Sequence, residues 1–453
     1  MNTSTLLVRV SLFFILVEIC LQPGMAKESP GGNERWVSTW ATALVPADAL
    51  DRFLADEPQF TNAKLDAAHA KNRTLREVVR VSIGGGKVRI RLSNVYGAGP
   101  LQVGAAHVAI RAAGAAIVPG TDRALSFSGE PSFRIPAGAV VVSDPVALEV
   151  PPAAELAISI HLPAATDLNS MHYTQATSFV STPGNYTAVE KMPVERSVQA
   201  WHVLERVEVA AASAPLLVAF GDSITDGTAS SVDAHKDWPA QFSLRLQQAG
   251  IELAVVNEGI GGNRILNDLV GPNALARFDR DVVSHSGTRY LVFLEGINDI
   301  VLWRLLDRPE ERPSAADLIG GMKQLIARAH AHGIKVFGGT LLPLGGAQAA
   351  SREVENLRQS VNQWIRSAGE FDAVIDFDAA LRDPADQTRM LAKYSSDDRV
   401  HPNDAGYLAM AEAFDLKLVA GGQTVRQRTL MESIPALSSP KTANEKLLGL
   451  PAK

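Results

Sequence analysis

The sequence predicts a mostly antiparallel β domain followed by an α/β domain with a parallel sheet. The first prediction rests on short segments of alternating hydrophobic and polar residues between about 36 and 200. The second rests on apolar runs of strand length that alternate with amphipathic stretches of helix length after about 215. A chain of 453 residues is long enough for two such domains.

The clearest strand pattern of the first part lies at 76–94. Hydrophobic residues alternate with polar ones over 79–83 and again over 88–92, and Gly84-Gly85-Gly86 separates the two runs. This pattern predicts a β-hairpin with one buried face. Only the stretch 48–71 is typical of a helix. Together with the alternation at 156–162, the pattern favours a β-sandwich.

In the second part, strands and helices are expected in turn. The predicted strands are Leu216–Phe220, Leu253–Val256, Tyr290–Leu294, Lys335–Thr340 and Ala373–Ile375. The predicted helices are Trp238–Ala249, Ala315–His332, Arg352–Ala368 and Ala405–Val419. Such alternation predicts a parallel sheet with helices on both faces and a ligand site at the carboxyl ends of the strands.

The first 26 residues are typical of a secretory signal peptide. Arg9 precedes the short apolar run 10–17, and small residues near Ala26 suit signal peptidase cleavage. The apolar run is too short to span a bilayer, so we expect export to the periplasm or the medium and no stable membrane association. The only cysteine, Cys20, lies in this segment, so the mature chain is expected to lack disulfides.

The charge balance argues against nucleic acid as a partner. The net charge is −6 and 20% of the residues are charged, which gives no basic surface of the kind that nucleic-acid binding requires. No cofactor is expected: Gly259-x-Gly261 resembles the start of a dinucleotide fingerprint, but Arg264 stands where its third glycine belongs. No metal site is expected either, because His330 and His332 are two residues apart near a helix end and point to different sides.

Four short motifs carry the chemistry. Gly-Asp-Ser at 221–223 follows the first predicted strand, Gly-Gly-Asn at 261–263 the second and Gly-Ile-Asn-Asp at 296–299 the third, while Asp398-Arg-Val-His401-Pro precedes the last helix. Each motif alone has a plain structural explanation, such as a tight turn or a helix cap. Their joint occurrence at strand ends favours a catalytic site.

These residues suit nucleophilic catalysis on an acyl group. Ser223 is the candidate nucleophile, and His401 is the base that takes its proton. Asp398, three residues earlier, is expected to orient His401; Asp397 is the competing carboxylate and lacks that offset. The backbone N–H groups of Ser223 and Gly262 and the side-chain amide of Asn298 are the expected oxyanion-hole donors. Asp222 is expected to brace the nucleophile loop.

The four motifs resemble the signature blocks of the SGNH (GDSL) hydrolases over residues 215 to 420. The resemblance implies a flavodoxin-like three-layer α/β/α fold, esterase activity and the same roles for Ser223, Gly262, Asn298 and His401. The expected organisation is a signal peptide at 1–26, an N-terminal β domain at 27–212, the SGNH hydrolase domain at 213–420 and a flexible tail at 421–453.

The opening Trp36-Val-Ser-Thr-Trp40-Ala and the segment 177–184 resemble an exported branch of SGNH esterases with an N-terminal β domain, which includes xylanase-associated arylesterases and deacetylases. The expected substrate is a short-acyl ester, with acetyl foremost and polysaccharide as a possible carrier. The alternatives are a lipase or thioesterase-type acylhydrolase and a non-catalytic glycan-binding protein. His172 and Tyr173, in an expected loop, are candidates to reach over the site, and 301–314 is expected to form a wall or lid beside Asn298.

Overall fold

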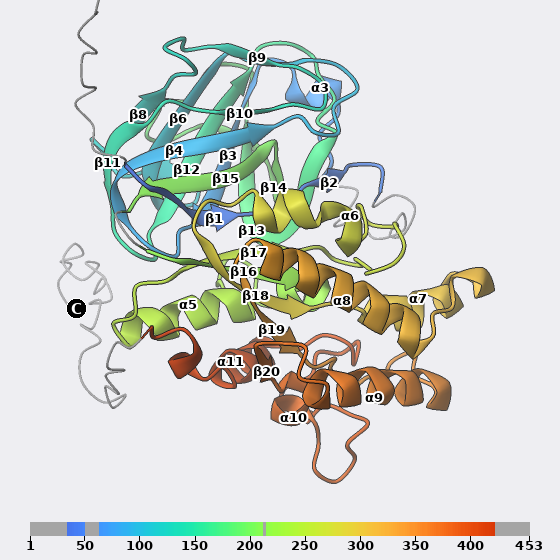
Figure 1. The fold of residues 1–453 in the computed structure, drawn as a ribbon. Coiled ribbons are helices and arrows are strands. Elements are labelled where there is room, and N and C mark those ends of the chain that lie inside the picture. The colour runs from blue at the N-terminus through green and yellow to red at the C-terminus, as the bar shows by residue number, and fades with distance from the viewer. Residues whose placement is uncertain (1–33, 50–62, 212–213, 422–453) are drawn as a thin grey trace, which may run out of the picture. The chain divides into compact units, whose positions relative to one another are not determined.

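The computed structural model describes residues 34–49, 63–211 and 214–421, and the chain from Arg35 onward forms one compact unit. Residues 36–210, here called the β region, hold the antiparallel strands, and residues 216–418, here called the α/β region, hold a parallel sheet with its helices (Figure 1). The predicted signal peptide and the predicted tail beyond Gly421 lie outside the described residues and stay predictions.

The β region contains two large antiparallel sheets. The first has the order β1 (Trp36–Ala41), β15 (Leu204–Ala210), β4 (Gly85–Ser93) and β10 (Val140–Val142), with β11 (Val146–Val150) also beside β4. The second has the order β14 (Val194–His202), β13 (Ser170–Ser181), β3 (Arg73–Arg80), β12 (Glu155–Leu162), β6 (Ala105–Ala113) and β7 (Ala116–Ile117), with β2 (Val45–Pro46) beside β13 and β8 (Arg123–Leu125) beside β6. A smaller pair joins β5 (Leu101–Val103) to β9 (Phe133–Ile135).

The two large sheets share one hydrophobic core. Val88, Ile90 and Leu92 of β4 and Ile158 and Ile160 of β12 are fully buried in it. Because successive residues of a strand face opposite sides, these i and i+2 positions line the inner face of each sheet. The predicted antiparallel, sandwich-like architecture is confirmed.

The predicted hairpin at 76–94 is wrong in its pairing. Its two strands form as β3 and β4, but they belong to different sheets. The chain crosses between the sheets at 81–84, where Thr39 Oγ1 accepts from the N–H of Ile83 and Val81 N–H donates to the carbonyl of Ala154. The interior residues of β3 are buried on both faces of the strand. One of them, Arg76, donates to the carbonyls of Ala115 and Val189, which belong to segments outside the neighbouring strands of β3.

The helix expected at 48–71 is found only in part. Within the described residues of that stretch the structure has the single-turn helix α3 (Ala67–Ala70), which Asp66 caps by accepting from the N–H of His69. Residues 50–62 lie outside the described part of the chain.

The α/β region has a five-stranded parallel sheet. Its order is β17 (Ala254–Gly259), β16 (Leu216–Gly221), β18 (Thr288–Leu294), β19 (Lys335–Gly339) and β20 (Ala373–Ile375). The helices are α4 (Ser223–Asp226), α5 (Trp238–Gln248), α6 (Ala274–Phe278), α7 (Ile297–Leu305), α8 (Ala315–Ala331), α9 (Arg352–Ser367), α10 (Phe377–Leu381) and α11 (Asp404–Glu412). Short π- and 3₁₀-helical turns are η1 (Asp279–Val283), η2 (Pro309–Glu311) and η3 (Leu416–Leu418).

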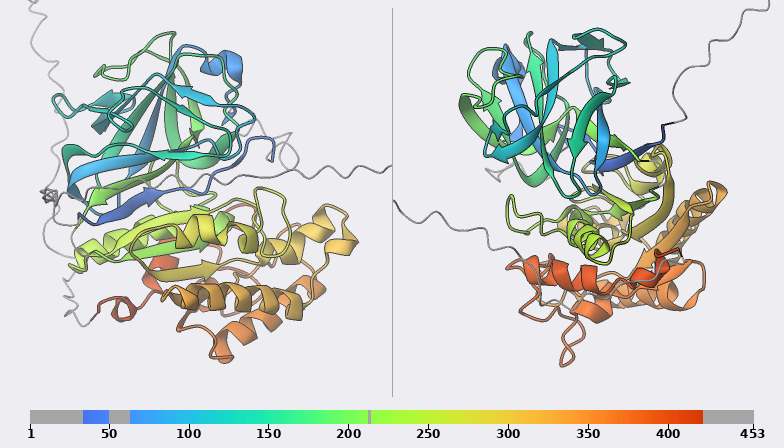
Figure 2. Two further views of the ribbon diagram at one scale, coloured as in Figure 1. Left: turned by 45° about the horizontal axis from the view of Figure 1, so that its top comes forward. Right: turned by 90° about the vertical axis from the view of Figure 1, so that its left-hand side faces the viewer.

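The helices form two groups around this sheet (Figure 2). Contacts join α5 and α10 to α11 in one group, and join α6 and α9 to α8 in the other. The predicted alternation of strands and helices is thereby confirmed. The helix expected at Ala405–Val419 is shorter, because it ends at Glu412 and the chain continues to η3, which Asp415 caps.

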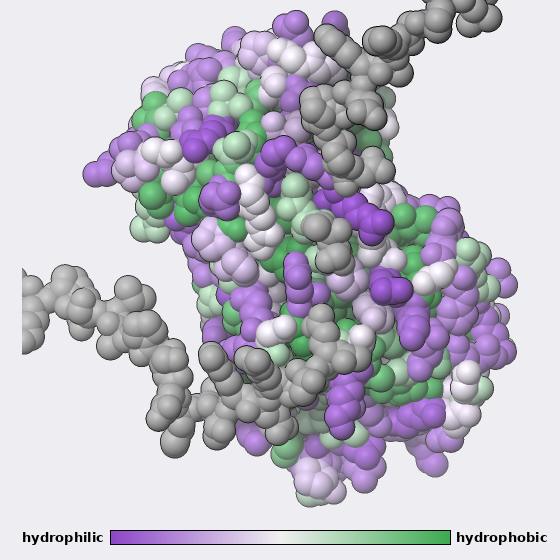
Figure 3. Space-filling view, turned by 60° about the vertical axis from the view of Figure 1, so that its left-hand side comes forward, coloured by the Kyte–Doolittle hydropathy of each residue, from purple (hydrophilic) through white to green (hydrophobic). Residues whose placement is uncertain are grey.

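Hydrophilic and hydrophobic residues are interspersed on the face of the molecule that Figure 3 shows, and the hydrophobic ones form separate patches there. Among the described residues, no helix has both the length and the apolar character that crossing a membrane would need.

Candidate active site

Ser223 lies where the parallel sheet ends and α4 begins. Strand β16 runs to Gly221, and Asp222 caps α4 by accepting a hydrogen bond from the N–H of Ile224 at 2.9 Å. A Cβ atom at Gly221 would collide with the carbonyl of Leu294 and the hydroxyl of Thr225. Glycine at 221 thus lets the chain turn sharply and present Ser223 at the carboxyl edge of the sheet. The expected bracing role of Asp222 agrees with its cap.

His401 connects Ser223 to Asp398. Its Nε2 lies 2.7 Å from Ser223 Oγ, and its Nδ1 lies 2.6 Å from Asp398 Oδ2. Asp398 Oδ1 also accepts from the backbone N–H of Val400 at 2.7 Å and that of His401 at 2.9 Å. Partial burial acts to raise the pKa of Asp398, but its hydrogen bonds and the charge of His401 hold that pKa well below the usual range. Asp397 is exposed.

The two other expected oxyanion-hole residues follow the neighbouring strands. Gly262 follows β17 and has φ of 75°, a left-handed conformation that favours glycine. Asn298 is the second residue of α7, after β18, and its amide donates to the carbonyl of Asn263 at 2.9 Å. Both residues line the same cavity as Ser223 and His401. The structure thus brings together all five residues that the sequence singled out.

Asp299 fixes the loop that carries Gly262. Its carboxylate accepts from the N–H of Ile265 at 2.8 Å and from that of Leu266 at 3.0 Å. Because Asp299 directly follows Asn298, these bonds set the distance between the loop and the start of α7. This explains structurally why an aspartate accompanies the asparagine in the third motif.

Arg277 is a supporting residue that the sequence reasoning missed. It is buried, and it donates to the carbonyl of Gly221 at 2.9 Å, to the carbonyl of Glu258 at 2.7 Å and to Asn263 Oδ1 at 2.9 Å. These bonds join the ends of β16 and β17 beneath the site. No sequence pattern marks this role, because Arg277 lies in an ordinary amphipathic turn and meets its partners only in the folded chain.

Three buried carboxyl groups, Asp222, Glu295 and Asp299, lie close enough to interact with one another behind Ser223. Burial raises the pKa of Asp222 to about 7 and that of Asp299 to about 6, and it raises the pKa of Glu295 well above its ordinary value. Arg277 Nη2 lies 3.5 Å from Glu295 Oε2. Burial and their mutual repulsion therefore favour the protonated forms of these carboxyl groups.

The cavity at Ser223 has a volume of about 410 Å³. Its reactive groups occupy one part of the lining, and most of the remainder is apolar. The apolar lining residues are Val45, Ile260, Val270, Ile297, Val301, Leu302, Leu305, Leu344, Ala349 and Val400. The sequence shows no long apolar stretch near the motifs, but folding gathers apolar residues from several segments around them. The expected wall at 301–314 is formed in part by α7.

The β region also contributes to this cavity. His172 and Tyr173 line it, as the sequence suggested, although they lie within β13 and not in a loop. His172 Nε2 lies 2.9 Å from Asp226 Oδ1, and Asp226 is the last residue of α4. The sequence reasoning missed Asp226, although its position three residues after Ser223 places both on one side of a helical turn.

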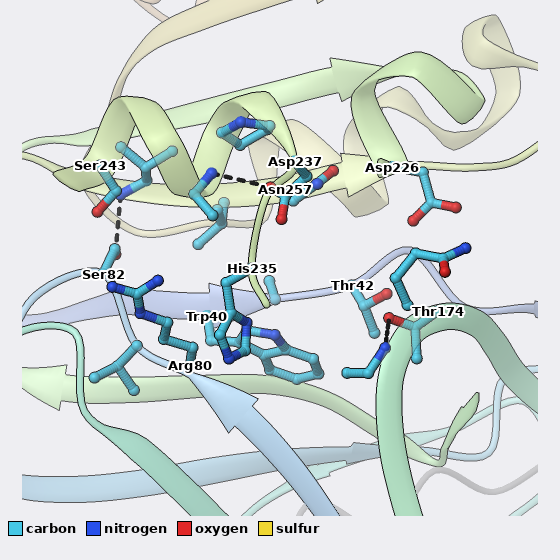
Figure 4. A pocket seen from close by; sticks show the side chains of 18 of the residues that line it. Trp40, Thr42, Arg80, Ser82, Thr174, Asp226, His235, Asp237, Ser243 and Asn257 are labelled. Atoms are coloured by element: carbon cyan, nitrogen blue, oxygen red, sulfur yellow. Dashed lines mark hydrogen bonds between the residues drawn. The ribbon is translucent and has the colours of Figure 1, made fainter. Parts of the chain in front are cut away.

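A second, smaller cavity of about 110 Å³ adjoins the first and shares His172 and Asp226 with it. We call it the polar chamber. Figure 4 shows Asp226, Asp237 and Asn257 on its α/β side and Trp40, Thr42, Arg80 and Thr174 on its β side. Trp40 packs edge to face on Trp201 at 4.9 Å and is buried, which supports a packing role for Trp40 over a sugar-stacking one.

No group of three or more His, Cys, Asp or Glu side chains in the described parts of the chain is arranged to hold a metal ion. His330, one of the two histidines considered above, instead lies 2.9 Å from Asp372 on the surface.

The four motifs lie around one cavity at the carboxyl edge of the parallel sheet, and a match to a family of lipases and acylhydrolases shows that this part of the chain is a hydrolase of carboxylic esters. Residues 219–409 match the model of the GDSL-like lipase/acylhydrolase family, and this part of the chain is a domain of the SGNH hydrolase superfamily.

Solved structures similar to this chain include three hydrolases. A GDSL-like lipase from Bacteroides thetaiotaomicron VPI-5482 has 20% identity over 44% of this chain and 84% of its own, with a TM-score of 0.33. An acetylxylan esterase from Geobacillus stearothermophilus has 23% identity over 48% and 98%, with a TM-score of 0.37. An α/β hydrolase from the metagenome of Lake Arreo, Spain, has 20% identity over 46% and 96%, with a TM-score of 0.37. A search of curated proteins gave no match.

Proposed function

We propose that this protein is an exported serine esterase that hydrolyses short-acyl esters, with Ser223, His401 and Asp398 as its catalytic triad. The observation that carries the proposal is the chain of contacts from Ser223 Oγ to His401 Nε2 at 2.7 Å and from His401 Nδ1 to Asp398 at 2.6 Å. A nucleophile, a base and an orienting carboxylate within hydrogen-bond reach are what acyl transfer requires. Export rests on the sequence of residues 1–26.

In the proposed mechanism, Ser223 Oγ attacks the ester carbonyl carbon while His401 Nε2 takes the hydroxyl proton. The negative charge that forms on the carbonyl oxygen is stabilised by the N–H groups of Ser223 and Gly262 and by the amide of Asn298. His401 then gives its proton to the departing alcohol, which leaves an acyl group on Ser223. A water molecule, deprotonated by His401, attacks this acyl-enzyme and releases the acid and free Ser223.

The proposed acyl group is short, with acetyl foremost, and acetylated polysaccharide is the first natural substrate class to test. The exported branch that the N-terminal segments resemble supports this choice. The apolar cavity of about 410 Å³ supports a second candidate, an acylhydrolase for longer chains, because its walls bury hydrocarbon and offer few partners to hydroxyl groups.

The test compares initial rates on p-nitrophenyl acetate, butyrate, octanoate and palmitate and acetate release from acetylated xylan. The protein is used from residue 27 onward, beside Ser223→Ala. We expect the rate to peak at acetate or butyrate and to fall by about 10⁴-fold or more in Ser223→Ala. A peak at octanoate or palmitate selects the second candidate.

Ser243→Ala is the matched control, since Ser243 lines the polar chamber and not the cavity with Ser223. It should retain full activity. A wild-type protein that binds xylan but hydrolyses none of these esters would instead favour the glycan-binding alternative and refute the triad proposal.

A further inference from the structure

One polar position interrupts the apolar lining of the active-site cavity close to the nucleophile. Asp226 from α4 and His172 from β13 both line the cavity, and they bind each other across the junction between the two regions at 2.9 Å. The His172 side chain is 4% exposed, whereas that of Asp226 is 13% exposed. The aspartate is therefore the member of the pair that an entering molecule can reach.

The hydrogen bonds of His172 fix the charge of the pair. Nδ1 of His172 lies 2.8 Å from the carbonyl oxygen of Ala43, and Nε2 faces the Asp226 carboxylate. A carbonyl oxygen can only accept, so Nδ1 donates to Ala43, and donation from Nε2 to Asp226 as well gives the imidazolium form. Burial acts to lower the pKa of His172, but Asp226 and these hydrogen bonds raise it above its ordinary value overall.

Asp226 lines the cavity, and its Oδ2 is not the oxygen that faces His172. Oδ1 receives the hydrogen bond from His172, and Oδ2 lies beside the Gly261–Gly262 turn, 3.9 Å from where a Cβ of Gly261 would stand. A carboxylate oxygen accepts hydrogen bonds and donates none. Because residues three apart on a helix have Cβ atoms about 5–6 Å apart, Oδ2 is within reach of a group a few bonds from an ester carbonyl attacked by Ser223.

From this geometry we infer that Asp226, held by His172, is a specificity-determining residue that binds a free hydroxyl next to the scissile ester. The preferred substrate class is then a monoester of a vicinal diol, such as a partly acylated sugar or glycol. The inference rests on the proposed function, since it assumes attack by Ser223. The polar chamber adjoins the same pair on the side away from Ser223 (Figure 4).

Two small esters of nearly equal shape test the inference. 2-Hydroxyethyl acetate carries the hydroxyl, and n-propyl acetate has a methyl group in its place. Wild-type kcat/KM should be at least about tenfold higher for the hydroxy ester, since a hydrogen bond to a charged group contributes about 1.5–3 kcal/mol, or about 10- to 100-fold. Equal values for the two esters would overturn the inference without any variant.

Asp226→Asn changes the acceptor while its oxygen can still receive the bond from His172. It should lower kcat/KM for the hydroxy ester by about 10- to 100-fold and that for the propyl ester by less than about threefold. An equal loss of kcat/KM on both esters would show that Asp226 and His172 only hold the two regions together, and would overturn the inference. The matched control is Asp233→Asn, because Asp233 also joins the two regions, through Thr177 at 2.7 Å, but does not line the cavity. Asp233→Asn should leave the ratio of the kcat/KM values for the two esters unchanged.

The outcomes also separate this inference from the proposed function. If wild type hydrolyses both esters equally and Ser223→Ala hydrolyses neither, the esterase proposal stands and the hydroxyl site fails. If the Ser223→Ala variant is as active as wild type, the triad proposal fails, and the inference falls with it.

Discussion

At the scale of single residues, the tightest part of the site is the turn from Asp398 to His401. Asp398 accepts hydrogen bonds from the backbone N–H groups of Val400 and His401, and its Oδ2 lies 2.6 Å from Nδ1 of the His401 ring. Arg399 between them has φ of 63°, a conformation uncommon for a residue with a side chain. The left-handed conformation of Arg399 thus accompanies the contact between the Asp398 carboxylate and the His401 ring within one short loop.

Asp398→Asn should lower kcat by about 10³- to 10⁴-fold with little change in KM, because an amide can hold His401 in the wrong tautomer and cannot stabilise the imidazolium. Initial rates on p-nitrophenyl acetate measure the loss. The matched control is Asp397→Asn, which alters the exposed neighbouring carboxylate and should leave kcat within about twofold. If the Asp397 variant shows the larger loss, our choice of carboxylate is wrong.

The residues of the proposed triad and oxyanion hole could be predicted from the sequence because Ser223, Gly262 and Asn298 follow strands of one parallel sheet, whose carboxyl ends meet at one edge, while Asp398 and His401 share one short motif before the last helix. Arg277 and Asp226 could not. The partners of Arg277 lie at 221, 258 and 263, and Asp226 meets His172, 54 residues earlier, only when the β region packs on α4. Such contacts depend on tertiary packing, which local patterns do not contain.

Asp222 should make stability depend on pH. Its Oδ2 is buried with no hydrogen-bond partner among the described residues, and burial raises its pKa from 3.8 to about 7. The folded state therefore holds a proton that the unfolded state loses above pH 4, so this group's contribution to stability is lost as pH rises from about 4 to 7.

Asp222→Asn should remove that dependence while keeping the helix cap, since asparagine is also a good N-cap. We expect the variant to gain up to about 4 kcal/mol relative to wild type at pH 8 and much less at pH 4. Urea unfolding at both pH values measures the two differences. The same difference at pH 4 and pH 8 would contradict a proton held on Asp222.

At the scale of elements, α7 joins Asn298, the proposed oxyanion-hole residue, to the cavity wall. Asn298 lies in its first turn, and Val301, Leu302 and Leu305 line the cavity one and two turns later. The helix therefore fixes how far the apolar space extends from the oxyanion hole. The sequence analysis correctly placed a wall here, whereas its hairpin at 76–94 was wrong because β3 and β4 have suitable patterns but pair with distant strands.

Val301→Trp should shorten the cavity. Val301 is 7% exposed, so a larger side chain there must displace cavity volume or its neighbours, at a cost of about 1–3 kcal/mol in stability. We expect the rate on p-nitrophenyl octanoate to fall by tenfold or more while the rate on acetate stays within about threefold. Arg304→Trp, on an exposed position of the same helix, is the control and should change neither. An equal loss on both esters would show that α7 does not limit chain length.

At the scale of the whole molecule, hydrogen bonds join the β region to the α/β region. His285 Nδ1 lies 2.9 Å from Ser38 Oγ, and Gln247 donates to the carbonyl of Ser82 at 2.7 Å. Arg206 of β15 donates to the carbonyl of Ser284 at 3.1 Å and to its hydroxyl at 2.8 Å. Ser38, Arg206 and His285 are buried in this junction, so each region covers polar and apolar groups of the other, and folding of one region should depend on the other.

We therefore expect residues 36–421 to unfold in one cooperative transition, with calorimetric and van't Hoff enthalpies in agreement and with activity lost at the same temperature. Arg206→Ala should lower the free energy of unfolding by about 2–4 kcal/mol, because it removes two hydrogen bonds across the junction and opens a buried space. The Arg206→Ala variant should still unfold in a single transition, at a lower temperature than wild type. The control is Arg134→Ala, at an exposed position, which should change the free energy of unfolding by less than about 0.5 kcal/mol. Two separated transitions in the Arg206 variant, with activity lost only in the second, would mean that the α/β region folds and catalyses without the β region, and that His172 is dispensable to the site.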